Sequence, residues 1–144
     1  MPVVGFAGDG AFGISMNEMS AIGRSEWPPI TMVIFRNYQW GAEKRNTTLW
    51  YEDNFVGTEL DEKVSYAQIA KACGVDGVAV YGMDELHDAL TEAVDAQMRG
   101  EVTTFIEVML NQELGEPFRR DAMKNPVSVA GIDRNDMRPQ TNAV

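Results

Sequence analysis

The chain has 144 residues, a length typical of a single domain with its own hydrophobic core. Hydrophobic residues make up 44% and charged residues 24% of it, as in globular proteins rather than disordered or membrane-embedded ones. The formal net charge of -10 argues against a nucleic acid as the main partner, because such proteins neutralise phosphates with lysine and arginine. A small phosphorylated ligand remains compatible with this charge, because backbone amides and a divalent cation can bind phosphate groups.

The longest apolar run, Ile30 to Phe35, is much too short to cross a bilayer, and no secretory signal is recognisable. We therefore expect no membrane partner and a cytoplasmic location. The chain has one cysteine, Cys73, which lies in an apolar helical pattern. It cannot form an internal disulfide, and we expect it to be a reduced residue of the core.

The first half of the chain predicts a strand, a helix and a second strand. The apolar run Val3 to Ala7 precedes Gly8-Asp9-Gly10 and predicts a strand followed by a glycine turn. Apolar residues then recur at helical spacing and predict a helix over Gly13 to Gly23. The run Ile30 to Phe35 is typical of a strand that is buried on both faces. The segment Tyr38 to Asp61 lacks periodicity, and we expect a long functional loop there.

The second half continues this alternation, with helices expected at 65–74 and 84–100 and strands at 77–81 and 103–110. Ser65 and Gln68 have the spacing of a capping box, and Asp84 is the expected N-cap of the last helix. The alternation predicts an α/β fold with three layers, α/β/α, around a mostly parallel sheet. We expect one domain over residues 1–126 and a loosely ordered tail over residues 127–144.

Polar residues follow both strands of the first βαβ unit. Asp9 and Asn37 lie just past the strand ends, and parallel strands end at the same edge of a sheet, where open α/β folds bind ligands. Their oxygens are ligands of the kind that Mg²⁺ prefers, and Gly8 and Gly10 would let the backbone approach a phosphate group closely. The alternative is that Gly8-Asp9-Gly10 is only a turn and Asn37 an ordinary loop residue.

Gly8-Asp9-Gly10, a spacer of 26 residues and Asn37 together resemble the GDG-x-N signature of the thiamine diphosphate-dependent enzymes. This resemblance implies that Mg²⁺ is bound by the side chains of Asp9 and Asn37 and by the backbone carbonyl of Gln39. It also implies that the backbone around Gly8, Gly10 and Ala11 holds the diphosphate. The signature usually has a second asparagine, where this chain has Tyr38.

Two longer segments, Asn37 to Arg45 and Glu113 to Ala122, look like the sulfoacetaldehyde acetyltransferases within that family. Such enzymes convert sulfoacetaldehyde and phosphate into acetyl phosphate and sulfite, and they form dimers or tetramers. The resemblance implies that this chain is only the C-terminal, diphosphate-binding part. It also implies that the catalytic glutamate which activates the cofactor belongs to another domain. We therefore expect no catalytic residue in this chain and no turnover from it alone.

Three cationic residues are candidates for contact with a sulfonate or phosphate of the substrate: Lys44, Arg119 and Arg120. The alternative for them is an ordinary solvated position. Two other functions stay open at this point. One is a lyase resembling acetohydroxyacid synthases or decarboxylases of the same cofactor class, and the other is a non-catalytic α/β binding module.

Overall fold

The structure is a computed structural model that describes residues 1–112, without the side chains of residues 48–50. The strands are β1 (Val4–Gly8), β2 (Thr31–Arg36), β3 (Asp76–Val80) and β4 (Thr104–Met109). The helices are α1 (Asp9–Ile14), the 3-10 helix η1 (Met16–Glu18), α2 (Met19–Ile22), α3 (Gly41–Trp50), α4 (Tyr66–Ala72) and α5 (Met83–Arg99). None of these helices combines the length and the apolar composition that crossing a bilayer requires.

The four strands form one parallel sheet in the order β1-β2-β4-β3. The alternation of strands with helices explains this arrangement, because parallel neighbours need a crossover connection that returns the chain to the same edge. The register pairs Gly8 with Phe35 and Arg36 with Met109. Asp9 and Asn37 follow directly after the paired ends of β1 and β2, so both lie at the carboxyl edge of the sheet.

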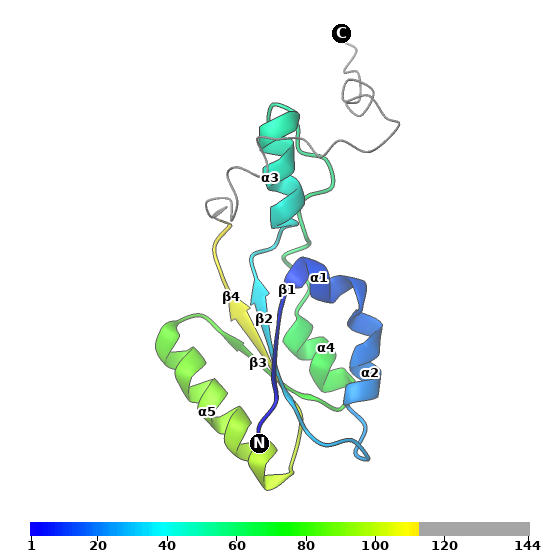
Figure 1. Ribbon diagram of the computed structural model, residues 1–144, viewed down its shortest axis with the longest axis vertical. Helices are drawn as coiled ribbons and strands as arrows, with labels where there is room; N and C mark the ends of the chain where they lie inside the picture. Colours follow the sequence, from blue (N-terminus) through cyan, green and yellow to red (C-terminus); the bar gives the residue numbers. More distant parts are fainter. Residues whose placement is uncertain (113–144) are drawn as a thin grey trace. The chain divides into compact units, whose positions relative to one another are not determined.

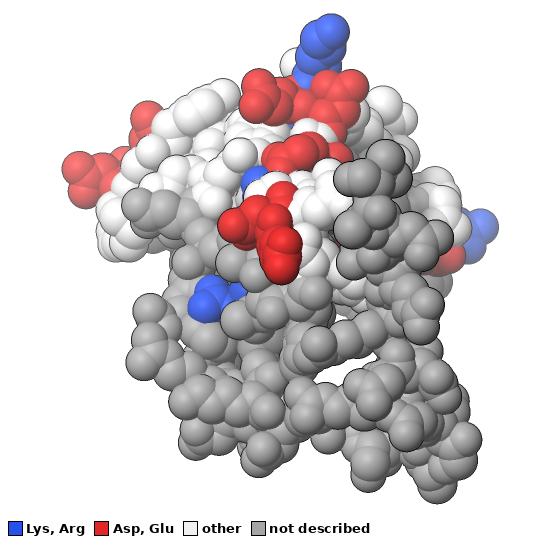
Figure 2. All heavy atoms as spheres, turned by 90° about the horizontal axis from the view of Figure 1, so that it is seen from above, with Lys and Arg blue, Asp and Glu red and all other residues white. Residues whose placement is uncertain are grey.

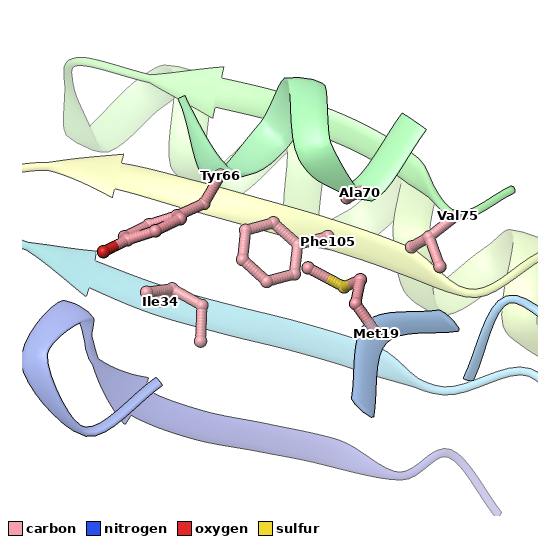
Figure 3. Close-up of a cluster of buried hydrophobic side chains, with 6 residues drawn as sticks. All are labelled: Met19, Ile34, Tyr66, Ala70, Val75 and Phe105. Carbon is pink, nitrogen blue, oxygen red and sulfur yellow. The ribbon is translucent and has the colours of Figure 1, made fainter. Parts of the chain in front are cut away.

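Helices cover both faces of the sheet, so the three-layer α/β/α prediction is confirmed (Figure 1). On one face, α2 and α4 pack on β2 and β4 around a buried apolar cluster, which Figure 3 shows. Its buried members are Met19, Ile34, Tyr66, Ala70, Val75 and Phe105. Phe12 of α1 packs against the rings of Tyr66 and Phe105 and so ties α1 to this layer.

Among residues 1–112, α5 is the one helix that covers the opposite face. Ala93 of α5 packs with Val33 of β2, Val80 of β3, and Ile106 and Val108 of β4. The α5 stripe that includes Leu86 and Leu90 adds to this layer, as the helical periodicity of the sequence predicts. The two apolar layers explain why β2 and β4 carry almost continuous apolar runs, since both strands are buried on both faces.

The structure corrects the expectation for the first helix. In place of one helix over Gly13 to Gly23, α1 begins at Asp9 and ends at Ile14, and η1 and α2 follow. The break lies at Ser15, whose backbone angles of φ -113° and ψ 18° are not helical. The glycine segment therefore opens a helix immediately instead of forming a separate turn. Asp9 is the first residue of that helix.

Two further expectations are wrong in detail. The segment Tyr38 to Asp61 contains the ten-residue helix α3, which has few apolar residues and therefore gave no periodic signal. Gly82, not Asp84, is the N-cap of α5, and Asp84 lies in the first turn, where an acidic side chain suits the helix dipole. Ser65 caps α4 as predicted, because its Oγ accepts a hydrogen bond from the backbone N–H of Gln68.

Cys73 is half-buried at the C-terminal end of α4, packed against the apolar cluster of Figure 3, and is a free thiol. The predicted domain boundary after residue 126 and the tail over 127–144 lie outside the described residues.

Candidate functional site

Asp9 is the centre of the predicted site and is only 2% exposed. Its Oδ1 accepts a hydrogen bond from the backbone N–H of Gly10 at 2.9 Å, and its Oδ2 accepts one from the N–H of Tyr38 at 2.8 Å. The second bond joins the segments that follow β1 and β2, which the register brings together by pairing Gly8 with Phe35. The carboxylate is therefore held in one orientation by two backbone donors from different segments.

Three oxygen atoms converge next to this carboxylate. Oδ1 of Asn37 faces the backbone carbonyl oxygen of Gln39 at 3.1 Å and Oδ1 of Asp9 at 3.2 Å. All three atoms are acceptors, so the arrangement needs either a rotated Asn37 amide, which would donate to both neighbours, or a cation between the oxygens. Among residues 1–112, no cluster of three or more His, Cys, Asp or Glu side chains offers a different metal site.

The predicted residues line a common hollow of about 370 Å³. Gly8 to Ala11 form one side of it, and Asn37, Gln39 and Trp40 belong to the other. A larger hollow of about 460 Å³ lies beside α4, β3 and β4, but it contains none of these residues. The converging oxygens distinguish the smaller hollow as the candidate ligand site.

The two glycines of the segment have different surroundings. A Cβ atom added to Gly8 would meet no atom of residues 1–112 within 4 Å, so the described structure leaves space beside the backbone there. A Cβ atom added to Gly10 would lie 3.1 Å from the indole ring of Trp40, which is tighter than ordinary van der Waals contact. Gly8 thus leaves room for a ligand, whereas Gly10 allows Trp40 to pack against the start of α1.

Lys44, predicted as a substrate contact, lies on α3 and pairs with the carboxylate of Glu59. The hydrogen bond from this ammonium group, more than any other cause, holds the pKa of Glu59 below its ordinary value of 4.5. The Lys44 ammonium also lies 5.3 Å from the centroid of the Phe55 ring. Lys44 is not among the residues that line the 370 Å³ hollow. Arg119 and Arg120 lie outside the described residues.

On the face that Figure 2 draws, the described part of the surface is acidic. Figure 2 looks down from the end at which α3 lies in Figure 1, and acidic side chains predominate there over basic ones. The formal net charge of -10 agrees with this view. Such a surface attracts cations and repels a bare diphosphate, so a diphosphate ligand would need a cation to neutralise it.

Sequence reasoning missed a buried ion pair directly beneath the site. Arg36, the residue before Asn37, is fully buried, and its Nε lies 3.1 Å from Oε1 of the buried Glu107. A signal for this pair was present in the sequence, because each strand carries one charged residue within an apolar run. Two such residues on strands that pair in the sheet are expected to neutralise each other.

Comparison with known proteins gives the same assignment as the sequence pattern. Residues 1–108 match the family model described as thiamine pyrophosphate enzyme, C-terminal TPP binding domain, where thiamine pyrophosphate (TPP) is another name for thiamine diphosphate. Over 139 residues the chain is 72% identical to the sulfoacetaldehyde acetyltransferase of Roseovarius nubinhibens and 70% identical to that of Rhodobacter capsulatus. Each alignment covers 96% of this chain and 23% of the relative, so the chain spans about a quarter of their length.

Among solved structures, the benzoylformate decarboxylase from Polynucleobacter necessarius is similar, with a TM-score of 0.66 and 26% sequence identity. The match covers 79% of this chain and 20% of that structure. Because the family model covers most of the chain, the chain belongs to the thiamine pyrophosphate enzymes and carries their C-terminal TPP-binding domain.

Proposed function

We propose that this chain binds the diphosphate end of thiamine diphosphate through Mg²⁺, as one domain of a sulfoacetaldehyde acetyltransferase. The observation that carries this proposal is the convergence of the oxygens of Asp9, Asn37 and Gln39 in a chain of this family. The donor set is one carboxylate, one side-chain amide and one backbone carbonyl. All three are hard oxygen donors of the kind that Mg²⁺ prefers.

The spacing of the oxygens also fits this ion. Adjacent ligands of an octahedral Mg²⁺ with bonds of 2.0–2.1 Å lie about 3 Å apart. With the Asn37 amide oxygen facing its two neighbours, the separations of 3.1 and 3.2 Å need only small adjustments to reach that geometry. Three protein oxygens on one side leave the remaining positions for phosphate oxygens and water. The cation would neutralise part of the negative charge of a diphosphate bound there, which the acidic surface would otherwise repel.

The segment from Gly8 to Ala11 would hold the diphosphate itself. Open space at the Gly8 Cα lets phosphate oxygens approach the backbone, and the first N–H groups of α1 have no partners within that helix. The N–H of Gly10 already donates to Asp9, so a bound phosphate would share or replace that hydrogen bond. Trp40 closes the hollow on the side of α3.

In the complete enzyme, bound thiamine diphosphate supplies a nucleophilic carbon that also accepts electrons. The residues of this chain bind and orient its diphosphate end. We propose a cytoplasmic homo-oligomer in which other domains supply the catalytic glutamate, and in which a sulfonated aldehyde and phosphate are the substrates. The high identity to the two sulfoacetaldehyde acetyltransferases supports this choice of substrates.

Binding is tested by titrating thiamine diphosphate into the chain with and without Mg²⁺ while tryptophan fluorescence is followed. Trp40 lines the hollow and is the expected reporter. Asp9→Ala should weaken Mg²⁺-dependent binding more than about tenfold, which is the scale of lost metal-ligand interactions. The matched control is Asp88→Ala on the outer face of α5, where the carboxylate is 86% exposed. Binding that is unaffected by Asp9→Ala would contradict the ligand assignment.

Activity needs the full translation product of the gene. It should form acetyl phosphate from sulfoacetaldehyde in a phosphate-dependent reaction, and pyruvate should be a poor substrate. A preference for pyruvate would instead identify a lyase resembling the acetohydroxyacid synthases. This assay tests the choice of substrate independently of the binding experiment.

A further inference from the structure

Tyr38 lies beside the candidate metal site, where its N–H contacts Asp9, and it has an uncommon backbone conformation. Its φ of +59° places it in the left-handed region, which glycine adopts readily but residues with bulky side chains adopt rarely. The residue stands between two of the proposed ligands, Asn37 and Gln39. An unfavourable conformation at such a position needs surrounding contacts that hold it.

The conformation of Tyr38 directs two of its backbone groups. Its N–H donates to Oδ2 of Asp9 at 2.8 Å, and its carbonyl oxygen accepts a hydrogen bond from the N–H of Leu60 at 2.8 Å. The first bond orients the carboxylate so that its other oxygen, Oδ1, lies 3.2 Å from the Asn37 amide. The chain after Tyr38 is held by this bond from Leu60 and by the bridge between Gln39 and Glu59. If Tyr38 relaxed to a right-handed conformation with that part of the chain in place, the peptide plane that carries its N–H would rotate, and Asp9 would lose one of its two backbone donors.

The side chain of Arg36 packs on the ring of Tyr38. Its guanidinium carbon lies 4.5 Å from the centroid of the Tyr38 ring and also 4.5 Å from that of Tyr66. At this distance a buried cation is attracted to the face of an aromatic ring. Within residues 1–112 its Nη1 has no hydrogen-bond partner. The two aromatic rings therefore supply part of the favourable contact that this buried cation makes.

Arg36 is itself fixed from three directions. Its Nη2 donates to the backbone carbonyls of Asp61 at 2.8 Å and of Val64 at 2.7 Å, in the segment before α4. Its Nε lies 3.1 Å from the carboxylate of Glu107. A guanidinium held by these contacts is a rigid surface against which the Tyr38 ring can pack.

We infer that Arg36 is a positioning residue for the metal site: its fixed guanidinium holds the Tyr38 ring and so keeps Tyr38 in the left-handed conformation that aims its N–H at Asp9. The inference rests on the proposed Mg²⁺ and diphosphate site, and it adds how that site is oriented. The ring of Tyr38 then has no need to touch the ligand. Its role is to fix the conformation of its own backbone.

Four substitutions of Tyr38 test this, with Mg²⁺-dependent binding of thiamine diphosphate as the readout. Tyr38→Phe keeps the ring and should bind as the parent chain does. Tyr38→Ala loses the ring and should bind about tenfold more weakly, because alanine also disfavours the left-handed region. Tyr38→Asn and Tyr38→Gly should bind within about threefold of the parent chain, because both residues accept this conformation.

The alternatives give different patterns. If Tyr38→Ala binds as well as Tyr38→Phe, the conformation of residue 38 does not matter and the inference is wrong. If Tyr38→Asn and Tyr38→Gly bind as weakly as Tyr38→Ala, the ring itself is needed and the backbone argument fails. Either result decides against the inference with Arg36 intact and the buried ion pair undisturbed.

The part played by Arg36 is tested in a variant that leaves no buried charge, Arg36→Met combined with Glu107→Gln. Gln keeps an acceptor for the amides at the start of α4. This variant should bind about tenfold more weakly, and adding Tyr38→Asn should restore binding. Loss of binding that Tyr38→Asn does not restore would show that Arg36 acts by a route other than Tyr38.

A readout without metal separates this inference from the proposed function. In the Mg²⁺-free chain, the N–H of Tyr38 should be protected from hydrogen exchange by its bond to Asp9, and Tyr38→Ala should remove that protection at residue 38. If Asp9→Ala leaves cofactor binding unchanged, the proposed function fails, yet the exchange pattern still tests the positioning of Tyr38. An unprotected N–H in the parent chain would contradict the inference by itself.

Discussion

The carboxylate of Glu107 connects Arg36 to the start of α4. Glu107 Oε1 lies 3.1 Å from Arg36 Nε, a distance typical of an ion pair, although the N–H is not aligned for a hydrogen bond. The same carboxylate accepts hydrogen bonds from the backbone N–H groups of Tyr66 and Ala67 and from the hydroxyl of Ser65. One buried acidic group therefore neutralises a cation beneath the site and satisfies the first amides of a helix.

Glu107→Gln should destabilise the fold strongly. The substitution keeps the shape of the side chain but leaves Arg36 as a buried charge without its counter-ion, which typically costs about 3–5 kcal/mol. Denaturant unfolding of the two chains measures the difference. Glu101→Gln is the matched control, because the Arg99–Glu101 pair is about half exposed and such surface pairs contribute little. Equal effects of the two substitutions would mean that the buried pair is not a stabilising unit.

The pair between Lys44 and Glu59 should make the stability depend on pH in the acid range. Lys44 lowers the pKa of Glu59 in the folded chain, so the pair stabilises the fold above pH 4.5 and this contribution is lost as the pH falls through the lowered pKa. Because the Glu59 side chain is 53% exposed, we expect the contribution to stay below about 1 kcal/mol.

The measurement is the free energy of unfolding of the parent chain and of Glu59→Gln at pH 7 and at pH 3. The difference between the two chains should be larger at pH 7. Lys44→Met and the double variant complete a cycle that isolates the interaction of the pair. A difference that grows towards pH 3 would have the wrong sign for a lowered pKa.

Much of the fold followed from the sequence because its signals are local and periodic. The four strands and α5 have clear apolar patterns in the sequence, and the capping-box spacing of Ser65 indicated the start of α4. The helix α3 gave no such pattern because it has little apolar surface to bury. Its position depends on contacts distant in the chain, such as the hydrogen bond from the N–H of Trp40 to the carbonyl of Thr58.

Of the candidate site, the sequence predicted the residues proposed to contact the ligand but not the contacts that position them. Asp9 and Asn37 were found because the ends of parallel strands meet, and this is a property of topology. The conformation of Tyr38 and its contact with Arg36 depend on packing between β2, β4 and the segment before α4. No spacing along the chain encodes these contacts, because they arise only when the chain is folded.

Gly77→Ala should destabilise the fold because no space exists for a methyl group at this position on β3. A Cβ atom there would lie 2.1 Å from the backbone carbonyl oxygen of Ala67 on α4, so helix and strand would have to separate. Overpacking of this kind costs roughly 1–3 kcal/mol, and a clash with backbone favours the upper end.

Gly13→Ala in α1 is the matched control for Gly77→Ala, because among residues 1–112 its added Cβ would meet only the Tyr66 hydroxyl at 3.4 Å, an ordinary contact. Alanine is also the better helix former, so Gly13→Ala should leave the stability unchanged or raise it by up to about 1 kcal/mol. Thermal unfolding of both variants gives the comparison. A tolerated Gly77→Ala would mean that α4 can move away from β3 at little cost.

Gly8→Ala should weaken cofactor binding while leaving the fold nearly intact. An added methyl group would meet no atom of the described residues within 4 Å, whereas a ligand in the 370 Å³ hollow would clash with it. The free energy of unfolding should fall by no more than about 1 kcal/mol, the difference between glycine and alanine at an N-cap. In the presence of Mg²⁺, we expect Gly8→Ala to bind thiamine diphosphate about tenfold more weakly than the parent chain does, an affinity loss of about 1.4 kcal/mol. Gly82→Ala, at the N-cap of α5, adds a methyl group that likewise meets nothing within 4 Å in the part of the chain that the structure describes, and it should leave cofactor binding unchanged. If both variants bind the cofactor as the parent chain does, the diphosphate does not approach the backbone at Gly8.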